Sequence, residues 1–365
     1  MKETDSEKHK WLSLQFIRGI AAIVVVVSHL IYWNNHAVTT ALLANTFQAR
    51  SGEVAVAIFF CLSGIVITSA HYRELGSSTQ KRSTLFSTFW IKRIFRIYPV
   101  YWFFGTLNFI LYHRGFVTPD FYVPGLTSIA SIIKAATLLF PAKAVAPAWS
   151  LTPELFFYFL FSLLFLSKRI GWIVAALCLL LAISNACQLT SLGADVINGA
   201  CLYFALGVGL FHFRPLLNRV ATLNFLGFLF WIPLFVVLLN FKPLLGFPNL
   251  PLTLLGAALL FSTALSMTAD AEESLPAWSR TLGFFLGDIS YSLYLGHFPV
   301  QMVLYAYLGP PDNPLRALAY VLIPMGIAWM TCIWLEKPLI RFSRKAIASK
   351  KASPASPLNR QFTGG

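Results

Sequence analysis

The stretch Trp11–Trp33, WLSLQFIRGIAAIVVVVSHLIYW, decides the fold of this chain. It is long enough to cross a bilayer as a helix, because about 20 apolar residues span the hydrocarbon core. It also contains Arg18 and His29, eleven positions apart. At about 100° and 1.5 Å per residue, this spacing closes about three turns, so both side chains share one helix face, about 16 Å apart in depth.

Charged and titratable side chains in a membrane face a protein interior or a watery cavity. The shared face of Arg18 and His29 therefore predicts a helix that lines a functional site inside a bundle. A competing explanation for Arg18 is that it snorkels to the membrane surface. His29 stands too far along the helix to reach the same surface.

The composition excludes a soluble globular domain, since 57% of the 365 residues are hydrophobic, 12% are charged and the mean hydropathy is +0.68. We expect an all-α, polytopic membrane helix bundle. The net charge of +14 comes from short basic clusters between apolar spans, typical of topology signals and anionic-lipid contacts. Membrane lipids are therefore expected partners and nucleic acid is not. The five cysteines lack metal-ligand spacing, so no metal site is expected.

Hydropathy predicts about ten membrane spans, with both termini in the cytoplasm. This topology places 22 of the 28 Lys and Arg residues inside, in agreement with the positive-inside rule. The segment 126–140 is apolar but short, which predicts an interfacial or re-entrant piece. The expected domains are a cytoplasmic segment 1–11, a membrane domain 12–341 and a disordered basic tail 342–365. The predicted spans are 12–33, 54–72, 97–113, 150–167, 171–187, 198–213, 222–240, 251–267, 284–308 and 315–335.

A carboxylate stands at the start of the fourth predicted span, in AWSLTPELFFYFLF. Glu154 follows Pro153 in the first helical turn, where the helix dipole favours a negative charge. His29 and Glu154 could meet near the outer face, and a carboxylate on one imidazole nitrogen leaves the other as a general base. The competing explanation is a solvated helix cap.

Two arginines precede the third predicted span, in WIKRIFRIYPVYW. Arg93 and Arg96 share one helix face, and paired guanidinium groups suit phosphate oxygens. A basic and aromatic anchor at the cytoplasmic interface is the competing explanation.

Together these motifs resemble the acyltransferase-3 family of bacterial integral-membrane O-acyltransferases. The similarity covers nearly the whole chain, and the motifs follow the family's order. They are the arginine and histidine spaced by ten residues (Arg18, His29), FFCLSGIVI at 59–67, the RxxR pair (Arg93, Arg96), WSLTPELFFY at 149–158, SYSLYLGHFPV at 290–300 and Glu336-Lys337-Pro338. In three places the chain departs from the family pattern. An acidic residue before the first motif is absent, Leu155 replaces a glutamate, and Gly296 replaces a tryptophan, which predicts a wider or reshaped acceptor pocket.

The resemblance implies an O-acyltransferase, most simply an acetyltransferase, of the bacterial inner (cytoplasmic) membrane. Cytoplasmic acyl-CoA would be the donor substrate, no cofactor would be bound permanently, and the acceptor would be an envelope polysaccharide or lipid-linked glycan. Arg18, Arg93 and Arg96 would bind the donor phosphates, while His29 and Glu154 would be catalytic. Weaker candidates for the acceptor site or the cavity lining are Ser150, Tyr158, Tyr291 and His297.

Several alternatives stay open from the sequence alone. A transporter or flippase would use Arg18, His29 and Glu154 as a proton relay. Transfer of succinyl or another acyl group is also compatible with the motifs, as is either direct transfer or transfer through an acyl-enzyme. His297 could be a packing residue that hydrogen-bonds between helices.

Overall fold

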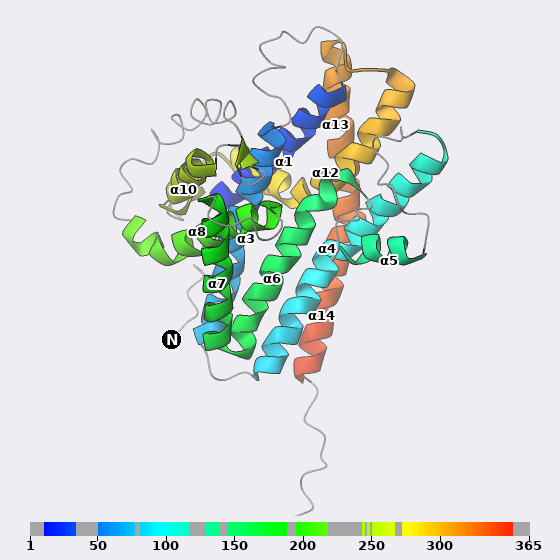
Figure 1. Ribbon diagram of the computed structural model, residues 1–365. Coiled ribbons are helices and arrows are strands. Elements are labelled where there is room, and N and C mark those ends of the chain that lie inside the picture. Colours follow the sequence, from blue (N-terminus) through cyan, green and yellow to red (C-terminus); the bar gives the residue numbers. More distant parts are fainter. Residues whose placement is uncertain are drawn as a thin grey trace, which may run out of the picture.

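A computed structural model describes residues 11–33, 50–76, 81–116, 129–138, 145–187, 195–217, 243–244, 247–248, 250–266 and 272–352. These residues form a helical bundle, with one short pair of strands (Figure 1). The elements are α1 (Leu12–Trp33), α3 (Arg50–Gly76), α4 (Arg82–His113), α5 (Ile129–Thr137), the 3₁₀ helix η3 (Ala146–Ser150), α6 (Leu151–Leu166), α7 (Lys168–Ala186), α8 (Asp195–Leu217), β1 (Pro243–Leu244), β2 (Phe247–Pro248), α10 (Leu250–Ser266), α12 (Ala277–Leu308), α13 (Pro314–Thr331), the π-helical turn η5 (Cys332–Glu336) and α14 (Lys337–Ala352).

The all-α membrane fold is confirmed. Within the described ranges, seven helical segments are long and apolar enough to cross a membrane. The 32-residue α12 is not among them, and it carries Ser290, Ser292, His297 and Gln301, all fully buried. A helix enclosed by protein can carry such polar groups because its neighbours, not lipid, contact them. The count of ten spans stays a prediction, and 222–240 lies outside the described residues.

Helices α1 and α12 pack closely along each other. A Cβ atom at Gly19 of α1 would lie 3.0 Å from the backbone carbonyl carbon and 3.2 Å from the Cα atom of Leu286 on α12, so this close approach requires glycine. Glycine commonly allows membrane helices to approach each other closely. The start of α1 is also fixed, because the buried Glu272 carboxylate accepts hydrogen bonds from the backbone N–H groups of Leu12 (2.9 Å) and Ser13 (3.0 Å). These contacts set the depth of Arg18 and His29 relative to α12.

Helix α4 begins at Arg82, well before the predicted start of the third span at residue 97. Arg93 and Arg96 therefore lie within a continuous helix that begins 15 residues before the predicted span. Charged residues lower the mean hydropathy of a segment whether their side chains face lipid or the protein interior. Here, both arginines face a polar cavity inside the bundle.

The apolar segment at 126–140 contains α5, which has nine residues. At 1.5 Å per residue α5 is roughly 14 Å long, too short to cross a bilayer. It lies against α4, since Tyr98, Tyr101 and Trp102 each donate a hydrogen bond to a carbonyl near its end. These bonds satisfy carbonyl groups that would otherwise be unpaired at the helix terminus.

The C-terminal helices α13 and α14 follow one another through η5 as a single long rod (Figure 1). A π-helical turn changes the direction in which side chains point, and such turns are frequent at functional sites. Here the turn ends at Glu336, which is buried. Helix α14 continues to Ala352, so the predicted boundary between the membrane domain and a disordered tail at 342 falls inside a helix. Residues 353–365 lie outside the described part.

Gly296 leaves no open space beside α12, so the expected widening of an acceptor pocket is not seen among the described residues, and a reshaped pocket stays a prediction. A Cβ atom at this position would lie 2.6 Å from the ring of Phe104, which is fully buried. The aromatic ring from α4 fills the space beside the glycine, so the two helices approach closely here instead of leaving a cavity.

Gly296→Ala is therefore expected to destabilise the bundle by about 1–3 kcal/mol, the usual cost of overpacking a core. Thermal unfolding in detergent, followed by the fluorescence of a thiol-reactive dye, measures the change. Adding Phe104→Leu to Gly296→Ala should recover part of the loss because the smaller side chain makes room. An unchanged melting temperature for Gly296→Ala would contradict the close contact.

Candidate active site

A polar cavity lies between α1, α3, α4, α6 and α12, with a volume of about 80 Å³. This space holds a few water molecules. Seven of the nine residues predicted from the sequence line it: Arg18, Arg93, Arg96, Ser150, Glu154, Tyr158 and Tyr291. The remaining two, His29 and His297, lie in a second cluster beside it. Distant parts of the sequence thus converge as the motifs predict, with the two histidines set apart.

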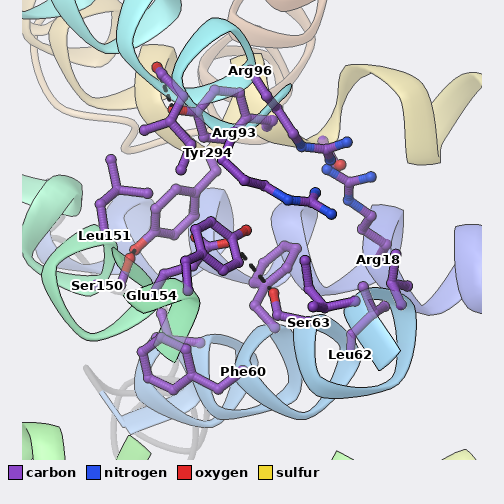
Figure 2. Close-up of a pocket in the computed structure, with 18 residues that line it drawn as sticks. Arg18, Phe60, Leu62, Ser63, Arg93, Arg96, Ser150, Leu151, Glu154 and Tyr294 are labelled. Atoms are coloured by element: carbon purple, nitrogen blue, oxygen red, sulfur yellow. Dashed lines mark hydrogen bonds between the residues drawn. The ribbon is translucent and has the colours of Figure 1, made fainter. Parts of the chain in front are cut away.

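Arg18, Arg93 and Arg96 form an arginine cluster, with their guanidinium groups gathered on one side of the cavity (Figure 2). Across the described residues, no carboxylate forms an ion pair with any of the three. The Nε atom of Arg93 is buried and has no hydrogen-bond partner among the residues that the structure describes. Three cations without a contacting anion are costly inside a membrane protein. The cluster therefore has the character of a site for an anionic ligand.

Arg93 is held in place by groups on both of its sides. Its guanidinium group lies 5.3 Å from the ring centroids of Phe89 and Tyr158, within the range of cation–π attraction. On the side of α3, its Nη2 atom donates to Nε2 of His71 at 3.5 Å. His71 is buried, and its Nδ1 atom lies 2.5 Å from the carboxylate of Glu74. A chain from Glu74 through His71 thus reaches the arginine cluster.

Glu154 projects into the cavity and is not a solvated cap. Its Oε1 atom accepts hydrogen bonds from the Tyr158 hydroxyl and from Ser63 Oγ, the latter at 3.4 Å. Electrostatic attraction links the carboxylate to Arg18 and Arg93 without direct contact. Its position in the first turn of α6 follows from η3, which ends at Ser150 and turns the chain into the helix.

A second carboxylate, Glu336, faces the arginine cluster from η5. It is 5% exposed, accepts a hydrogen bond from Ser292 Oγ at 2.8 Å, and interacts electrostatically with Arg96 and Arg18. The cluster therefore lies between two carboxylates, with three positive charges against two negative ones. The net positive charge of this group of side chains favours an anionic ligand.

Tyrosine hydroxyls join the helices around the cavity. Tyr291 donates to the carbonyl of Ile97 at 2.8 Å, and Tyr294 donates to the carbonyl of Pro147 at 2.7 Å. The Tyr294 hydroxyl also lies 2.7 Å from Ser150 Oγ. These bonds fix the relative positions of α12, α4 and η3, and thereby the shape of the cavity.

His29 contacts His297, not Glu154. The ring centroids of the two histidines are 5.0 Å apart, and His29 Nδ1 lies 3.3 Å from His297 Nε2. The described residues contain no hydrogen bond between His29 and Glu154. The expected contact is therefore absent: His297 is the side chain beside His29, and Tyr294 borders the cavity one turn before it.

The hydrogen bonds select one tautomer for each neutral histidine. His297 Nδ1–H donates to the carbonyl of Leu293 at 3.0 Å, so its Nε2 atom is an acceptor. His29 Nδ1–H then donates to the carbonyl of Val25 at 2.9 Å and points also to His297. The Nε2 atom of His29 is left without a proton, as a general base requires. The orienting groups are a backbone carbonyl and an imidazole, where the sequence predicted a carboxylate.

Four residues with clear contacts at the site or its supports were not predicted from the sequence: Ser63, His71, Glu272 and Glu336. Ser63 and Glu336 lie inside motifs that the sequence analysis quoted, so their position was a usable signal. His71 and Glu272 stand at the ends of apolar segments, where polar residues are common. Only their tertiary contacts distinguish them.

The comparison with family models agrees with this geometry, because the acyltransferase domain of the acyltransferase-3 type matches residues 11–333. The chain belongs to the acyltransferase-3 family. The chain is also similar to the acyltransferase MdmB of Streptomyces mycarofaciens, with 32% identity over 161 residues, or 41% of this chain. The chain spans 38% of MdmB in that match. No solved structure matches it. Family and fold together indicate a multi-pass membrane protein of the acyltransferase-3 family.

Proposed function

We propose that this protein is an O-acetyltransferase of the bacterial inner membrane. It transfers the acetyl group of cytoplasmic acetyl-CoA to a hydroxyl of an envelope polysaccharide or lipid-linked glycan. No permanently bound cofactor takes part. The observation that carries the proposal is the arginine cluster, whose guanidinium groups converge without contacting a carboxylate in the described part of the chain.

Coenzyme A supplies the anion that this cluster lacks. Its phosphate groups suit guanidinium groups, which bind phosphate oxygens through paired, charge-assisted hydrogen bonds. Arg18, Arg93 and Arg96 would bind those phosphates, while Glu154 and Glu336 limit the excess charge when the site is empty. The cavity of about 80 Å³ is smaller than the donor, so binding of acyl-CoA would move side chains or helices apart.

His29 is the proposed base for the transfer step. Its free Nε2 atom takes the proton from the acceptor hydroxyl, whose oxygen attacks the thioester carbonyl carbon. The carbon–sulfur bond then breaks, an ester forms, and the coenzyme A thiolate leaves and takes up the proton. His297 holds the His29 ring, and Glu154 acts on the donor side through the arginines. Ser150, Tyr158 and Tyr291 line the donor side of the site.

An assay with purified protein in nanodiscs tests the proposal. Release of the coenzyme A thiol from acetyl-CoA should require an envelope glycan acceptor, and mass spectrometry should find the acceptor heavier by one acetyl group. Cells lacking the gene should lose the same mass from their polysaccharides. Release of thiol without an acylated acceptor, in the presence of a full set of envelope glycans, would overturn the proposal.

A proton relay through Arg18, His29 and Glu154 finds no support in the contacts of the described residues. His29 bonds to Val25 and His297, while Glu154 bonds to Ser63 and Tyr158. A relay needs a continuous chain of titratable groups. We therefore do not propose transport as a second function.

The chain from Glu74 through His71 predicts a positioning role for His71. His71→Ala should raise the KM for acetyl-CoA about 3- to 10-fold with little change in kcat, since one weak hydrogen bond to a charged group is lost. In an Arg93→Ala background, His71→Ala should have no further effect. A double-mutant cycle on KM measures this coupling. Additive effects of the two substitutions would show that His71 acts independently of Arg93.

A further inference from the structure

A second cavity, of about 510 Å³, lies among α3, α6, α7 and α8 and is separate from the arginine cluster. Its walls are almost entirely apolar and include Phe157, Phe161, Trp172 and Val208. The volume is within the range of about 300–1,000 Å³ that is typical of ligand sites. Each of the four surrounding helices belongs to a segment able to cross a membrane. The medium around this cavity is therefore lipid.

One polar group inside the cavity lacks a partner. Thr68 lines the cavity from α3, is 2% exposed, and its Oγ1 atom forms no hydrogen bond with any described residue. An unsatisfied buried hydroxyl costs free energy unless a ligand supplies an acceptor. The ester carbonyl of a lipid chain is such an acceptor.

Positively charged side chains lie at one end of the helices that form the cavity. Helices α3 and α8 run in the same direction, because Phe60 contacts Phe204 and, further along both helices, Tyr72 contacts Phe211. Both helices carry an arginine in their last turn, Arg73 on α3 and Arg214 on α8. The lining of the cavity reaches Tyr72 on α3 and Phe213 on α8, the residues next to these arginines in the sequence. An apolar cavity that ends near two arginines is suited to a lipid with an anionic headgroup.

We propose that this cavity binds one acyl chain of an anionic phospholipid. The chain lies between α3, α6, α7 and α8, its ester carbonyl accepts a hydrogen bond from Thr68, and its headgroup lies near Arg73 and Arg214. The site is distinct from the proposed donor site, because no residue lines both cavities. The inference therefore stands whether or not the donor is acetyl-CoA.

Gly209 offers a direct way to fill the cavity. It lines the wall on α8, and a Cβ atom there would meet nothing within 4 Å. Gly209→Phe should therefore insert a ring into the cavity without a backbone clash. Gly326 on α13 also has open space around its Cβ position but lies outside the cavity, which makes Gly326→Phe a matched control.

The experiment measures lipid retained by the purified protein. Protein solubilised from vesicles of equal phosphatidylglycerol and phosphatidylcholine is analysed by native mass spectrometry. The parent protein and Gly326→Phe should retain one phosphatidylglycerol, and Gly209→Phe should lose it at least 10-fold. Thr68→Val, which preserves shape, should weaken retention about 3- to 5-fold, and Arg214→Gln should reduce the preference for phosphatidylglycerol. The Thr68→Val result provides the test if Gly209→Phe fails to fold.

Retention of the same lipid in Gly209→Phe and in the parent protein would overturn the proposal, as would an unchanged affinity in Thr68→Val. Equal retention of phosphatidylcholine and phosphatidylglycerol by the parent protein would contradict the proposed preference for an anionic headgroup. Acetyl transfer is measured separately in the same samples. If the parent protein transfers no acetyl group, the result counts against the proposed function. The lipid proposal is then still tested by native mass spectrometry, which does not depend on acetyl transfer.

Discussion

His29→Ala is expected to abolish acetyl transfer while leaving the binding of acetyl-CoA intact. A positioned general base contributes typically about 10²- to 10⁴-fold to a rate, and alanine offers no proton acceptor. Donor affinity should not change, because His29 does not line the cavity that holds the arginine cluster. The measurement is a pair of titrations in nanodiscs: initial rate of thiol release, and binding of coenzyme A by calorimetry.

His113→Ala is the matched control for this substitution. His113 lies at the end of α4, is exposed, and packs against Phe109 in a tilted arrangement with ring centroids 4.2 Å apart. Its loss removes one histidine without touching the site, so the rate should stay within about twofold of the parent rate. Transfer that survives His29→Ala at more than a tenth of the parent rate would contradict the role of His29 as the base.

His297→Ala adds a finer test to the same prediction. If His297 orients His29, its loss should lower kcat by less than the loss of His29, and the two substitutions together should be no worse than His29→Ala alone. A full additive effect would show that His297 contributes to transfer through another group.

Replacing the arginine cluster is expected to raise the KM for acetyl-CoA strongly. Each hydrogen bond between a charged group and its partner contributes about 1.5–3 kcal/mol, which corresponds to roughly a 10- to 150-fold change in affinity. Arg93→Ala and Arg96→Ala should each raise KM by at least 10-fold with a smaller change in kcat. Lysine at either position should restore only part of the affinity, because an ammonium group cannot form the paired contacts of a guanidinium group.

Arg82→Ala is the control for the arginine cluster. Arg82 lies on the same helix, α4, but its exposed guanidinium group donates to the carbonyl of Leu166 at 3.1 Å, away from the cavity. Its loss should leave KM unchanged. Donor KM values that stay constant in Arg93→Ala and Arg96→Ala would reduce both arginines to structural residues and would remove the main support for a phosphate-bearing donor.

The amino-acid sequence by itself determined the class of the fold and indicated most of the polar residues that line the candidate site. Long apolar stretches can only be membrane helices, because a bilayer offers no partner for unpaired backbone groups. A charge inside such a stretch is costly, so Arg18 and Glu154 were conspicuous without any structure. Hydropathy did not indicate how far α4 extends before residue 97, because Arg93 and Arg96 lower the local hydropathy although they face a protein interior.

Only the tertiary structure decided which of these residues meet. Helical periodicity places side chains on a face but does not state which helix lies opposite, and the packing of α1 against α12 brings His29 to His297 instead of Glu154. It likewise decided that Phe104 fills the space beside Gly296. Side-chain contacts between distant segments depend on the packing of the whole bundle, and no local pattern in the sequence records it.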